Sequence, residues 1–449
     1  MPLLAYSQRQ PSPFISRFLA LFLLGGQVYL IASRGFANLL ETPFLPYCLL
    51  GAFAIHMATR PTRRESVATV SLSVLLALGF VVWRPGFRWT WPNELAAASS
   101  TGLASLAVLT VEILRHRGAE LRQKLTTLIG GSVFIYSALF IAFILKATAA
   151  WHPATYDLFL YAADAGFGIP ITAQVGMFVA RHPALAWWCG LVYESLPLAV
   201  SLLYAYERSG GKPLPTRVLP AFLGGGAAAY LLYNILPAAG PIYIFGAQFP
   251  AHLPQVVQIA LQAPLMHDAP RNAVPSMHLA CALLIFWNVR RLSRWFYAAS
   301  GLYLGLTIVA TLGFGEHYVV DLIAGVPYAL LLGAACARQS VAPAILSPAR
   351  NHALVTGSLL TCTWIAALRF APALFRSMPL AWTAALATVI VCWLAQRRLE
   401  RAFARAAEST HRSFSSPDLP PESPLRPDPA WAAAAAGSHY AVEDTLPLP

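Results

Sequence analysis

The chain has 449 residues, of which 57% are hydrophobic and only 11% are Asp, Glu, Lys or Arg. A soluble protein of average composition carries about 25% charged residues, so this chain has too little charge to cover a soluble globule of its size. The high hydrophobic content also excludes an intrinsically disordered protein. The formal net charge of +12 would suit an acidic partner such as a nucleic acid. Whether it indicates one depends on where the basic residues lie.

Apolar segments recur along most of the chain, and many approach the roughly 20 residues that a transmembrane helix needs. They predict an all-α integral membrane protein with about twelve transmembrane helices. The first segment is long and is followed by many others, which argues against a cleavable signal peptide. The segments that begin at Phe44 and Met277 are shorter than a full span. The expected spans are Phe14–Ala32, Phe44–Met57, Ser66–Val82, Leu95–Leu114, Leu125–Leu145, Leu185–Tyr206, Leu219–Leu236, Met277–Val289, Trp295–Leu312, Tyr318–Ala337, Ala353–Leu368 and Leu380–Leu394.

The basic residues alternate along this series of spans. Most of them follow the even-numbered spans, and the other connections hold few. Because positive charge gathers on the cytoplasmic side, we expect a multi-pass protein of the cell (inner) membrane with both termini in the cytoplasm. The basic residues then orient the chain in the membrane and contact anionic lipid, so we expect no nucleic-acid partner. Two of the basic groups are Arg115, Arg117, Arg122 and Lys124 after the fourth span, and Arg397, Arg398, Arg401 and Arg405 after the twelfth.

The C-terminal segment after Glu400 becomes rich in Pro, Ser and Ala, so residues 399–449 are expected to form a disordered cytoplasmic tail. The six cysteines all fall within apolar segments without a C-x-x-C pair. This pattern predicts small buried side chains instead of a metal site or a disulfide framework. We expect no metal and no cofactor.

Two polar clusters each precede an apolar helix, and the expected topology places both at the extracytoplasmic face. They are Arg271–His278 and Gly313–Asp321. Ionisable groups are costly in a membrane, so each is a candidate for function. Pro275 stands where a helix begins, and the free N–H groups of the turn that follows, around Met277, would bind a phosphate with help from the Ser276 hydroxyl.

His317 and Asp321 are four residues apart and therefore share one helix face. A carboxylate there can accept the proton of one imidazole nitrogen and leave the other free as a nucleophile. Each motif alone is common, since Pro-Ser begins many helices and His-x-x-x-Asp is usually a surface pair. Their occurrence on one membrane face, with His278 in the first turn of the other helix, indicates a site for phosphoryl chemistry.

At these residues the chain resembles the type-2 phosphatidic acid phosphatase superfamily, whose second and third motifs read P-S-G-H and S-R-x5-H-x3-D. Here they read Pro275–His278 and His317-x3-Asp321. The forms Pro-Ser-x-His and His-Tyr-x-x-Asp, the latter with Tyr318, look most like the branch that contains inositol phosphorylceramide synthases. The stretch Tyr233–Tyr243 resembles that branch's upstream motif. The resemblance covers about residues 155–337.

The resemblance implies a six-helix membrane core and metal-independent phosphoryl transfer. His317 would attack phosphorus, Asp321 would orient it and His278 would protonate the leaving oxygen. The substrate would be a membrane phospholipid or an isoprenoid phosphate, with a lipid alcohol or water as acceptor. The expected organisation is N-terminal helices of unknown role (1–150), the catalytic core (151–340), a C-terminal transmembrane hairpin (341–398) and the tail (399–449).

The chain departs from the superfamily at three expected cations. The Lys and Arg of the first motif, K-x6-R-P, correspond to Tyr233 and Gly240, and the Arg of the third motif corresponds to Thr311. Arg271 is the expected substitute in phosphate binding, and its alternative is a headgroup anchor at the interface. Further candidates for substrate binding are Gly240, Tyr243, Tyr318 and Glu194, of which Glu194 could equally be a buried helix residue with a partner.

Three functions remain open. The first is transfer of a phospholipid headgroup, such as inositol phosphate, to a lipid alcohol. The second is hydrolysis alone, by a lipid-phosphate or polyprenyl-phosphate phosphatase. The third is a non-catalytic transporter or scaffold, and the missing cations are the best argument for the scaffold. The oligomeric state is not predicted.

Overall fold

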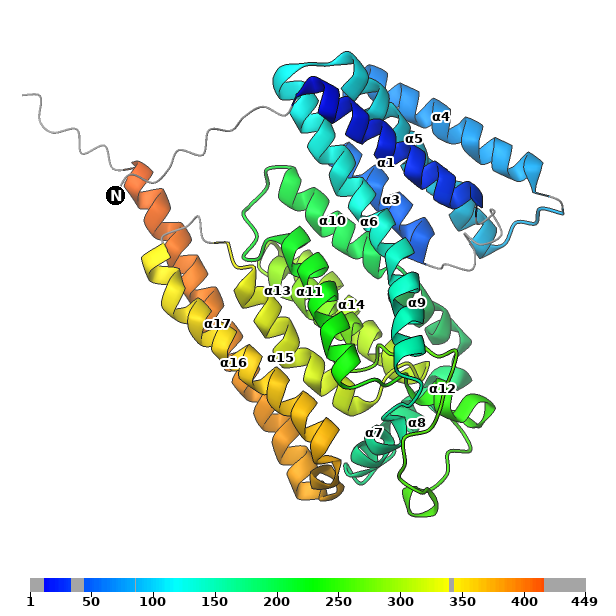
Figure 1. Ribbon diagram of the computed structural model, residues 1–449. Helices are drawn as coiled ribbons and strands as arrows, with labels where there is room; N and C mark the ends of the chain where they lie inside the picture. The colour runs from blue at the N-terminus through cyan, green and yellow to red at the C-terminus, as the bar shows by residue number, and fades with distance from the viewer. Residues whose placement is uncertain (1–11, 34–43, 85, 339–342, 416–449) are drawn as a thin grey trace, which may run out of the picture.

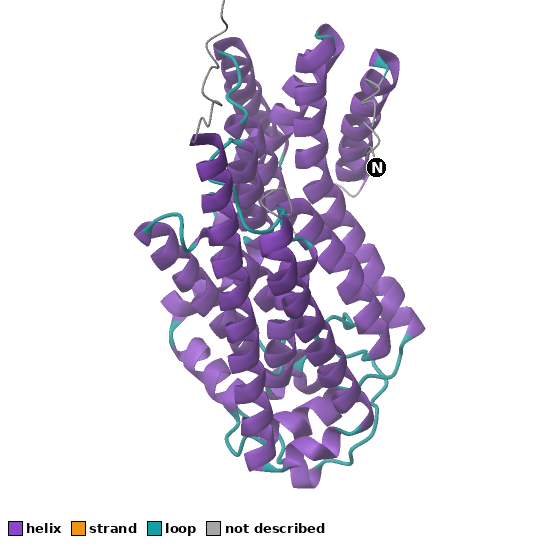
Figure 2. Ribbon diagram, turned by 90° about the vertical axis from the view of Figure 1, so that its left-hand side faces the viewer, coloured by secondary structure: helices purple, strands orange, loops and turns teal. Residues whose placement is uncertain are grey.

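The computed structural model describes residues 12–33, 44–84, 86–338 and 343–415, and within them it is helical, with two isolated β-bridges. Long helices run side by side along most of the molecule, and short helices gather at one end (Figures 1 and 2). This arrangement follows from the sequence, because long apolar segments bury their backbone polar groups only as helices. The N-terminal helices are α1 (Pro13–Ser33), α3 (Phe44–Ala58), α4 (Arg63–Trp83), α5 (Trp91–Arg115) and α6 (Gly118–Trp151).

The middle of the chain contains short helices between longer ones. Helices α9 and α10 meet at Ser195 with a bend of 53°. Pro197 lies in the first turn of α10 and lacks the N–H that would continue the helix, which explains the break. The helices are α7 (Asp157–Ala165), α8 (Ile171–Arg181), α9 (Pro183–Glu194), α10 (Leu196–Arg208), α11 (Val218–Ile235), α12 (Pro241–Phe245), η1 (Gly246–Gln248), η2 (Val256–Gln258), α13 (Met277–Val289), α14 (Arg294–Gly313) and α15 (Val319–Ala335).

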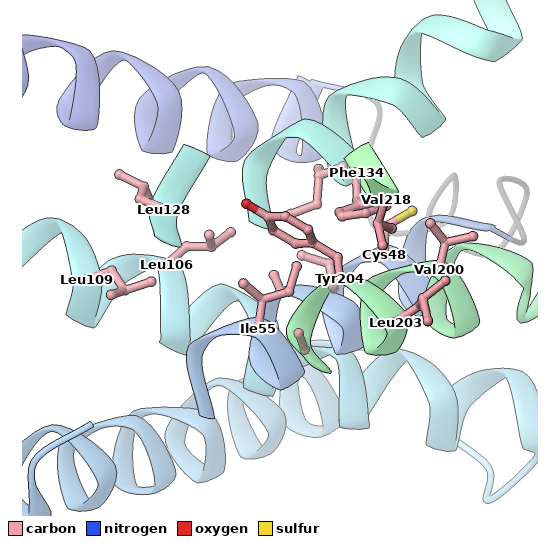
Figure 3. Packing of buried hydrophobic residues seen from close by; sticks show 14 of the residues in the cluster. Cys48, Ile55, Leu106, Leu109, Leu128, Phe134, Val200, Leu203, Tyr204 and Val218 are labelled. Atoms are coloured by element: carbon pink, nitrogen blue, oxygen red, sulfur yellow. The ribbon is translucent and has the colours of Figure 1, made fainter. Parts of the chain in front are cut away.

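The N-terminal helices and the middle of the chain share one hydrophobic core. Helix α3 is enclosed by α5, α6 and α10, and Figure 3 shows side chains of all four in a single cluster. A Cβ at Gly102 would lie 2.0 Å from the carbonyl oxygen of Leu49, so only glycine allows α5 to approach α3 this closely. On the other side Tyr204 of α10 packs against Phe134 of α6, with ring centroids 6.3 Å apart. The N-terminal helices are therefore part of the same packed body as the motif-bearing segment.

A C-terminal hairpin of α16 (Pro343–Phe370) and α17 (Met378–Ser415), joined by η3 (Pro372–Arg376), packs along α15. Helix α17 continues through residues 399–415, so the expectation that the tail begins at 399 is wrong for this part. These residues are rich in the strong helix formers Ala, Arg, Leu and Glu, and Leu399 and Ala402 are buried against the hairpin core. The rest of the expected tail, 416–449, lies outside the described residues.

Seven helices in the described part of the chain are long and apolar enough to cross a membrane, or eight if the bent α9–α10 pair is one span. All twelve expected segments fall on helices, but α1, α3, α13 and α15 count only as shorter apolar helices, so twelve spans are not shown. Within residues 158–335 the expected spans correspond to the α9–α10 pair, α11, α13, α14 and α15. These are five, one fewer than the six core helices that the resemblance implies.

Candidate active site

The two polar clusters meet where α13 and α15 begin. The backbone N–H of Ser276 donates to the carbonyl oxygen of Asp321 at 3.1 Å, which ties the first turns of the two helices together. The rings of His278 and His317 lie near each other, with centroids 6.2 Å apart. The structure therefore brings the two histidines, Ser276 and Asp321 into one place, although Ser276 and Asp321 belong to clusters 45 residues apart in the sequence.

His317 is held by a backbone carbonyl. Its Nδ1 lies 2.9 Å from the carbonyl oxygen of Ala273 and 3.5 Å from Oδ2 of Asp321. A carbonyl can only accept a hydrogen bond, so Nδ1 carries the proton and the lone pair is on Nε2. At 3.5 Å the carboxylate is a weak partner, and its Oδ2 accepts the N–H of Tyr318 at 2.8 Å. The Ala273 carbonyl thus does much of the orienting that the spacing assigned to Asp321.

Burial lowers the pKa of His317 to about 4, against the opposing effects of Glu316 and the Ala273 carbonyl. The imidazole is therefore neutral at pH 7, which is the form that can act as a nucleophile. Because the ring is nearly fully buried, the loss of hydration outweighs both opposing effects and the pKa of His317 falls.

His278 lies against aromatic side chains from two distant parts of the chain. Its ring stacks on Tyr193 of α9, with centroids 3.9 Å apart and an angle of 14°. Phe44, the first residue of α3, lies 6.2 Å from the same ring and 6.4 Å from Tyr193. Phe44 and Tyr193, which we call the aromatic wall, hold the half-buried imidazole in one plane. Phe44 belongs to the N-terminal helices, whose role could not be predicted from the sequence.

The first turn of α13 provides hydrogen-bond donors. The side chain of Ser276 caps the helix by accepting the N–H of Leu279 at 3.4 Å, and the N–H of Ala280 bonds to the Ser276 carbonyl. The two other N–H groups of this turn, those of Met277 and His278, have no hydrogen bond within the described residues. They lie at the positive end of the helix dipole, where an anion is stabilised.

Arg271 has a different environment from the one expected. Its side chain is fully buried, and its guanidinium donates to four backbone carbonyls, those of His152 at 2.9 Å, Pro153 at 3.4 Å, Ala269 and Met266. These contacts join the end of α6 to the loop before α13. Since four of its five N–H donors are used in this way, the structure argues against Arg271 as the substitute phosphate-binding cation.

The three missing cations are replaced by residues that hold the backbone of the site. Gly240 has φ = 116°, and a Cβ there would lie 2.4 Å from the carbonyl oxygen of Glu316, so no side chain fits at this position. The Tyr233 hydroxyl donates to the Pro275 carbonyl at 3.4 Å. The Thr311 carbonyl accepts the N–H groups of Glu316 and His317, each at 3.2 Å. All three positions support the loops around the histidines.

The remaining expected site residues lie around this centre. Tyr243 donates its hydroxyl to Glu316 at 3.2 Å, beside His317. Glu194 is the last residue of α9, next to Tyr193, and has no hydrogen bond to the site within the described residues. No group of three or more His, Cys, Asp or Glu side chains in the described part of the chain is arranged to hold a metal ion.

Two buried carboxylates of α7 were missed by the sequence reasoning. Asp157 accepts the N–H groups of Ala239 and Gly240 and the hydroxyl of Tyr318, at 3.1, 2.8 and 3.1 Å. Burial raises the pKa of Asp157, and these donors oppose the increase. Asp157 thus fastens the loop before α12 to the residue after His317.

Asp164 holds the start of α15. It accepts the N–H groups of Val319 and Val320 at 3.0 and 3.1 Å and the hydroxyl of Thr172 at 2.8 Å. Burial raises its pKa to about 6. The two acids are seven residues apart, two turns of one helix face, and this spacing in an otherwise apolar nine-residue helix was the signal available in the sequence.

Part of the chain matches a known protein family. Residues 158–335 match the family model described as the PAP2 superfamily, a range that includes both histidines, Asp321 and Asp164. No curated protein and no solved structure matches the chain. The segment 158–335 of this multi-helix chain is a PAP2 superfamily domain.

Proposed function

We propose that the protein is a membrane lipid phosphotransferase or phosphatase that acts through a phosphohistidine on His317. The observation that carries this proposal is the Nδ1 contact of His317 with the Ala273 carbonyl, since it leaves Nε2 as the nucleophilic nitrogen of a neutral ring. Membership of residues 158–335 in the PAP2 superfamily supports phosphoryl chemistry on a lipid phosphate ester.

The reaction has two steps. In the first, Nε2 of His317 forms a bond to phosphorus, the bond from phosphorus to the leaving oxygen breaks, and His278 gives that oxygen a proton. In the second, His278 takes the proton of the acceptor alcohol or of water. The acceptor oxygen then bonds to phosphorus, the P–N bond breaks and His317 is restored. Asp321 and the Ala273 carbonyl hold the Nδ1 proton throughout.

The free N–H groups of Met277 and His278 are the proposed phosphate-binding donors, with the Ser276 hydroxyl beside them. Because Tyr233, Gly240 and Thr311 replace the superfamily's cations, the site offers the phosphate little positive charge. A phosphodiester carries less negative charge than a monoester, so this favours transfer of a phospholipid headgroup over hydrolysis of a monoester. The narrower proposal is transfer of inositol phosphate to a lipid alcohol, supported by the His317-Tyr318-x-x-Asp321 form.

The proposed topology puts this site at the extracytoplasmic face, because most basic residues follow the opposite ends of the spans. A lipid would then reach the histidines sideways from the bilayer. The proposal predicts that the aromatic wall of Phe44 and Tyr193 lies beside the lipid's path.

The test uses purified protein with a panel of phospholipids and isoprenoid phosphates, with and without a lipid alcohol. His317→Ala should lose at least about a thousandfold in turnover, as expected for removal of a nucleophile. His278→Ala should retain formation of an acid-labile phosphoenzyme from a donor with a good leaving group. His182→Ala, which changes an exposed histidine, is the control and should keep wild-type turnover.

Turnover retained by His317→Ala would contradict the phosphohistidine. A wild-type protein that turns over no lipid phosphate, with or without an acceptor, would contradict catalysis altogether and favour a non-catalytic scaffold. Product formation only with the lipid alcohol present would establish transfer, and release of phosphate without it would establish hydrolysis.

A further inference from the structure

A groove of about 750 Å³ lies along α16 and α17, outside the PAP2 domain. Four arginines and one histidine line it, together with apolar side chains that include Trp393 and Leu394. We call it the arginine groove. Its cationic residues are Arg397, Arg398, Arg401, Arg405 and His352.

The four arginines have no acidic partner within the described residues. The buried carboxylate of this stretch, Glu400, is engaged elsewhere, by Arg290 and by Arg291 at 2.9 Å. Glu408, the next acid along α17, forms no ion pair with these arginines in the described part of the chain. Arg397, Arg401 and Arg405 follow one another at four-residue intervals, where like charges repel and destabilise a helix.

Arg397 gives an independent sign of a missing ligand. Its Nε is buried and has no hydrogen-bond partner within the described residues, and its guanidinium lies over the Trp393 ring at 5.2 Å. A buried donor left unbonded costs about 1–3 kcal/mol, so it is expected to have a partner. An anion in the arginine groove would supply that partner and relieve the repulsion among the cations.

The arginine groove lies far from the histidines. The catalytic centre is at the N-terminal end of α15, whereas Ala334, at its other end, packs in one cluster with Leu346 and Leu399 of the hairpin. The 17 residues of α15 span about 25 Å at 1.5 Å per residue. Figure 1 shows the start of α16 and the end of α17 together, at the opposite end of the molecule from α7, α8 and α12.

The position of the arginine groove along α17 indicates an amphiphilic ligand. The membrane-length apolar part of α17 runs from Met378 to Ala406, so the arginines lie in its last turns, where a helix leaves the hydrocarbon. Trp393 and Leu394 are 51% and 54% exposed there. A soluble anion would use the arginines and leave this apolar surface uncovered, whereas a phospholipid would use both.

We propose that the arginine groove binds an anionic phospholipid, with the headgroup phosphate among the four arginines and the acyl chains along Trp393 and Leu394. The site is separate from the catalytic centre and does not depend on the proposed reaction. By the expected topology it belongs to the cytoplasmic leaflet, where anionic lipids are concentrated.

The test measures lipid binding by the full-length protein in neutral detergent. Mixed micelles with phosphatidylglycerol, phosphatidylcholine or inorganic phosphate are compared by their shift of the thermal midpoint and by bound lipid after gel filtration. The quadruple variant R397Q/R398Q/R401Q/R405Q removes the cations. Its control, R60Q/R63Q/R64Q/R117Q, removes the same charge from exposed residues elsewhere.

Wild type and control should bind phosphatidylglycerol with the same affinity within about threefold. The groove variant should bind it at least about a hundredfold more weakly, since each arginine near an anionic lipid is worth roughly a fivefold change. Equal binding by the groove variant and wild type would overturn the proposal. If inorganic phosphate shifts the thermal midpoint as much as the lipid does, the ligand is a soluble anion and the proposal of a phospholipid is overturned. If the groove variant does not fold, R397Q and R401Q are tested singly, and unchanged lipid binding by both overturns the proposal.

Discussion

Substitution of Asp157 is the most informative single change, because this buried carboxylate connects two loops of the candidate site. Its Oδ1 is the acceptor for three buried donors, the N–H groups of Ala239 and Gly240 and the hydroxyl of Tyr318. Asp157→Asn keeps the shape and one oxygen but removes the negative charge. The matching amide nitrogen would face the N–H of Ala239, which now also reaches Oδ2 at 3.1 Å.

The magnitude follows from the kind of hydrogen bond that is lost. A bond to a charged group contributes about 1.5–3 kcal/mol and a neutral bond about 0.5–1.5 kcal/mol. Three bonds that each lose about 1 kcal/mol lower the free energy of unfolding by about 3 kcal/mol. The thermal midpoint should fall by roughly 5 °C or more. Tyr318 adjoins His317, so its release should also lower kcat, since a displacement of about 1 Å can cost about a hundredfold.

The assay combines thermal unfolding in detergent with turnover of the lipid phosphate found for the wild type. Tyr318→Phe removes only one of the three donors, so it should cost about a third as much stability. In the double variant the two effects should be less than additive, because both changes break the same bond. Asp268→Asn, at an exposed acid of the loop before α13, is the control and should leave both quantities unchanged.

A wild-type thermal midpoint together with a kcat within twofold of wild type for Asp157→Asn would refute this role of Asp157. Fully additive effects of Asp157→Asn and Tyr318→Phe would also refute it, because the hydrogen bond between the two side chains would then contribute nothing. A lower thermal midpoint with an unchanged kcat would show that Asp157 stabilises the fold without positioning His317.

Two other predictions concern pH and Arg271. Because burial lowers the pKa of His317 to about 4, the nucleophilic ring stays neutral as pH falls from 7 to 5. The kcat/KM for a phosphodiester donor should therefore decline only near pH 4. A decline centred on pH 6.5 would refute the lowered pKa of His317. Arg271→Gln should lower the free energy of unfolding by about 3 kcal/mol or more, because several backbone carbonyls lose their donor. Arg271→Lys should not restore this stability, since one ammonium group cannot reach all of these carbonyls. A raised KM with an unchanged thermal midpoint would instead support phosphate binding by Arg271.

The sequence predicted most of the features that are set within a single segment. Hydrophobic runs predicted the positions of the helices, because the need to bond every backbone group in an apolar environment acts within each segment. The motif around Pro275 predicted a helix start with free donors, and His317 and Asp321 were expected on one face because they are one turn apart. Local composition was misleading for residues 399–415, where burial of Leu399 and Ala402 against the hairpin extends α17.

The sequence by itself thus determined the all-helical membrane architecture and the two motifs to which we assign the proposed chemistry. Only the tertiary structure decided what surrounds them. Phe44 reaches His278 from the N-terminal helices, and Asp157 bonds to a residue 161 positions away. Arg271 was expected at the phosphate but is held by the backbone near the end of α6. Such contacts depend on how distant segments pack, and residue type and spacing along a single segment do not specify that packing.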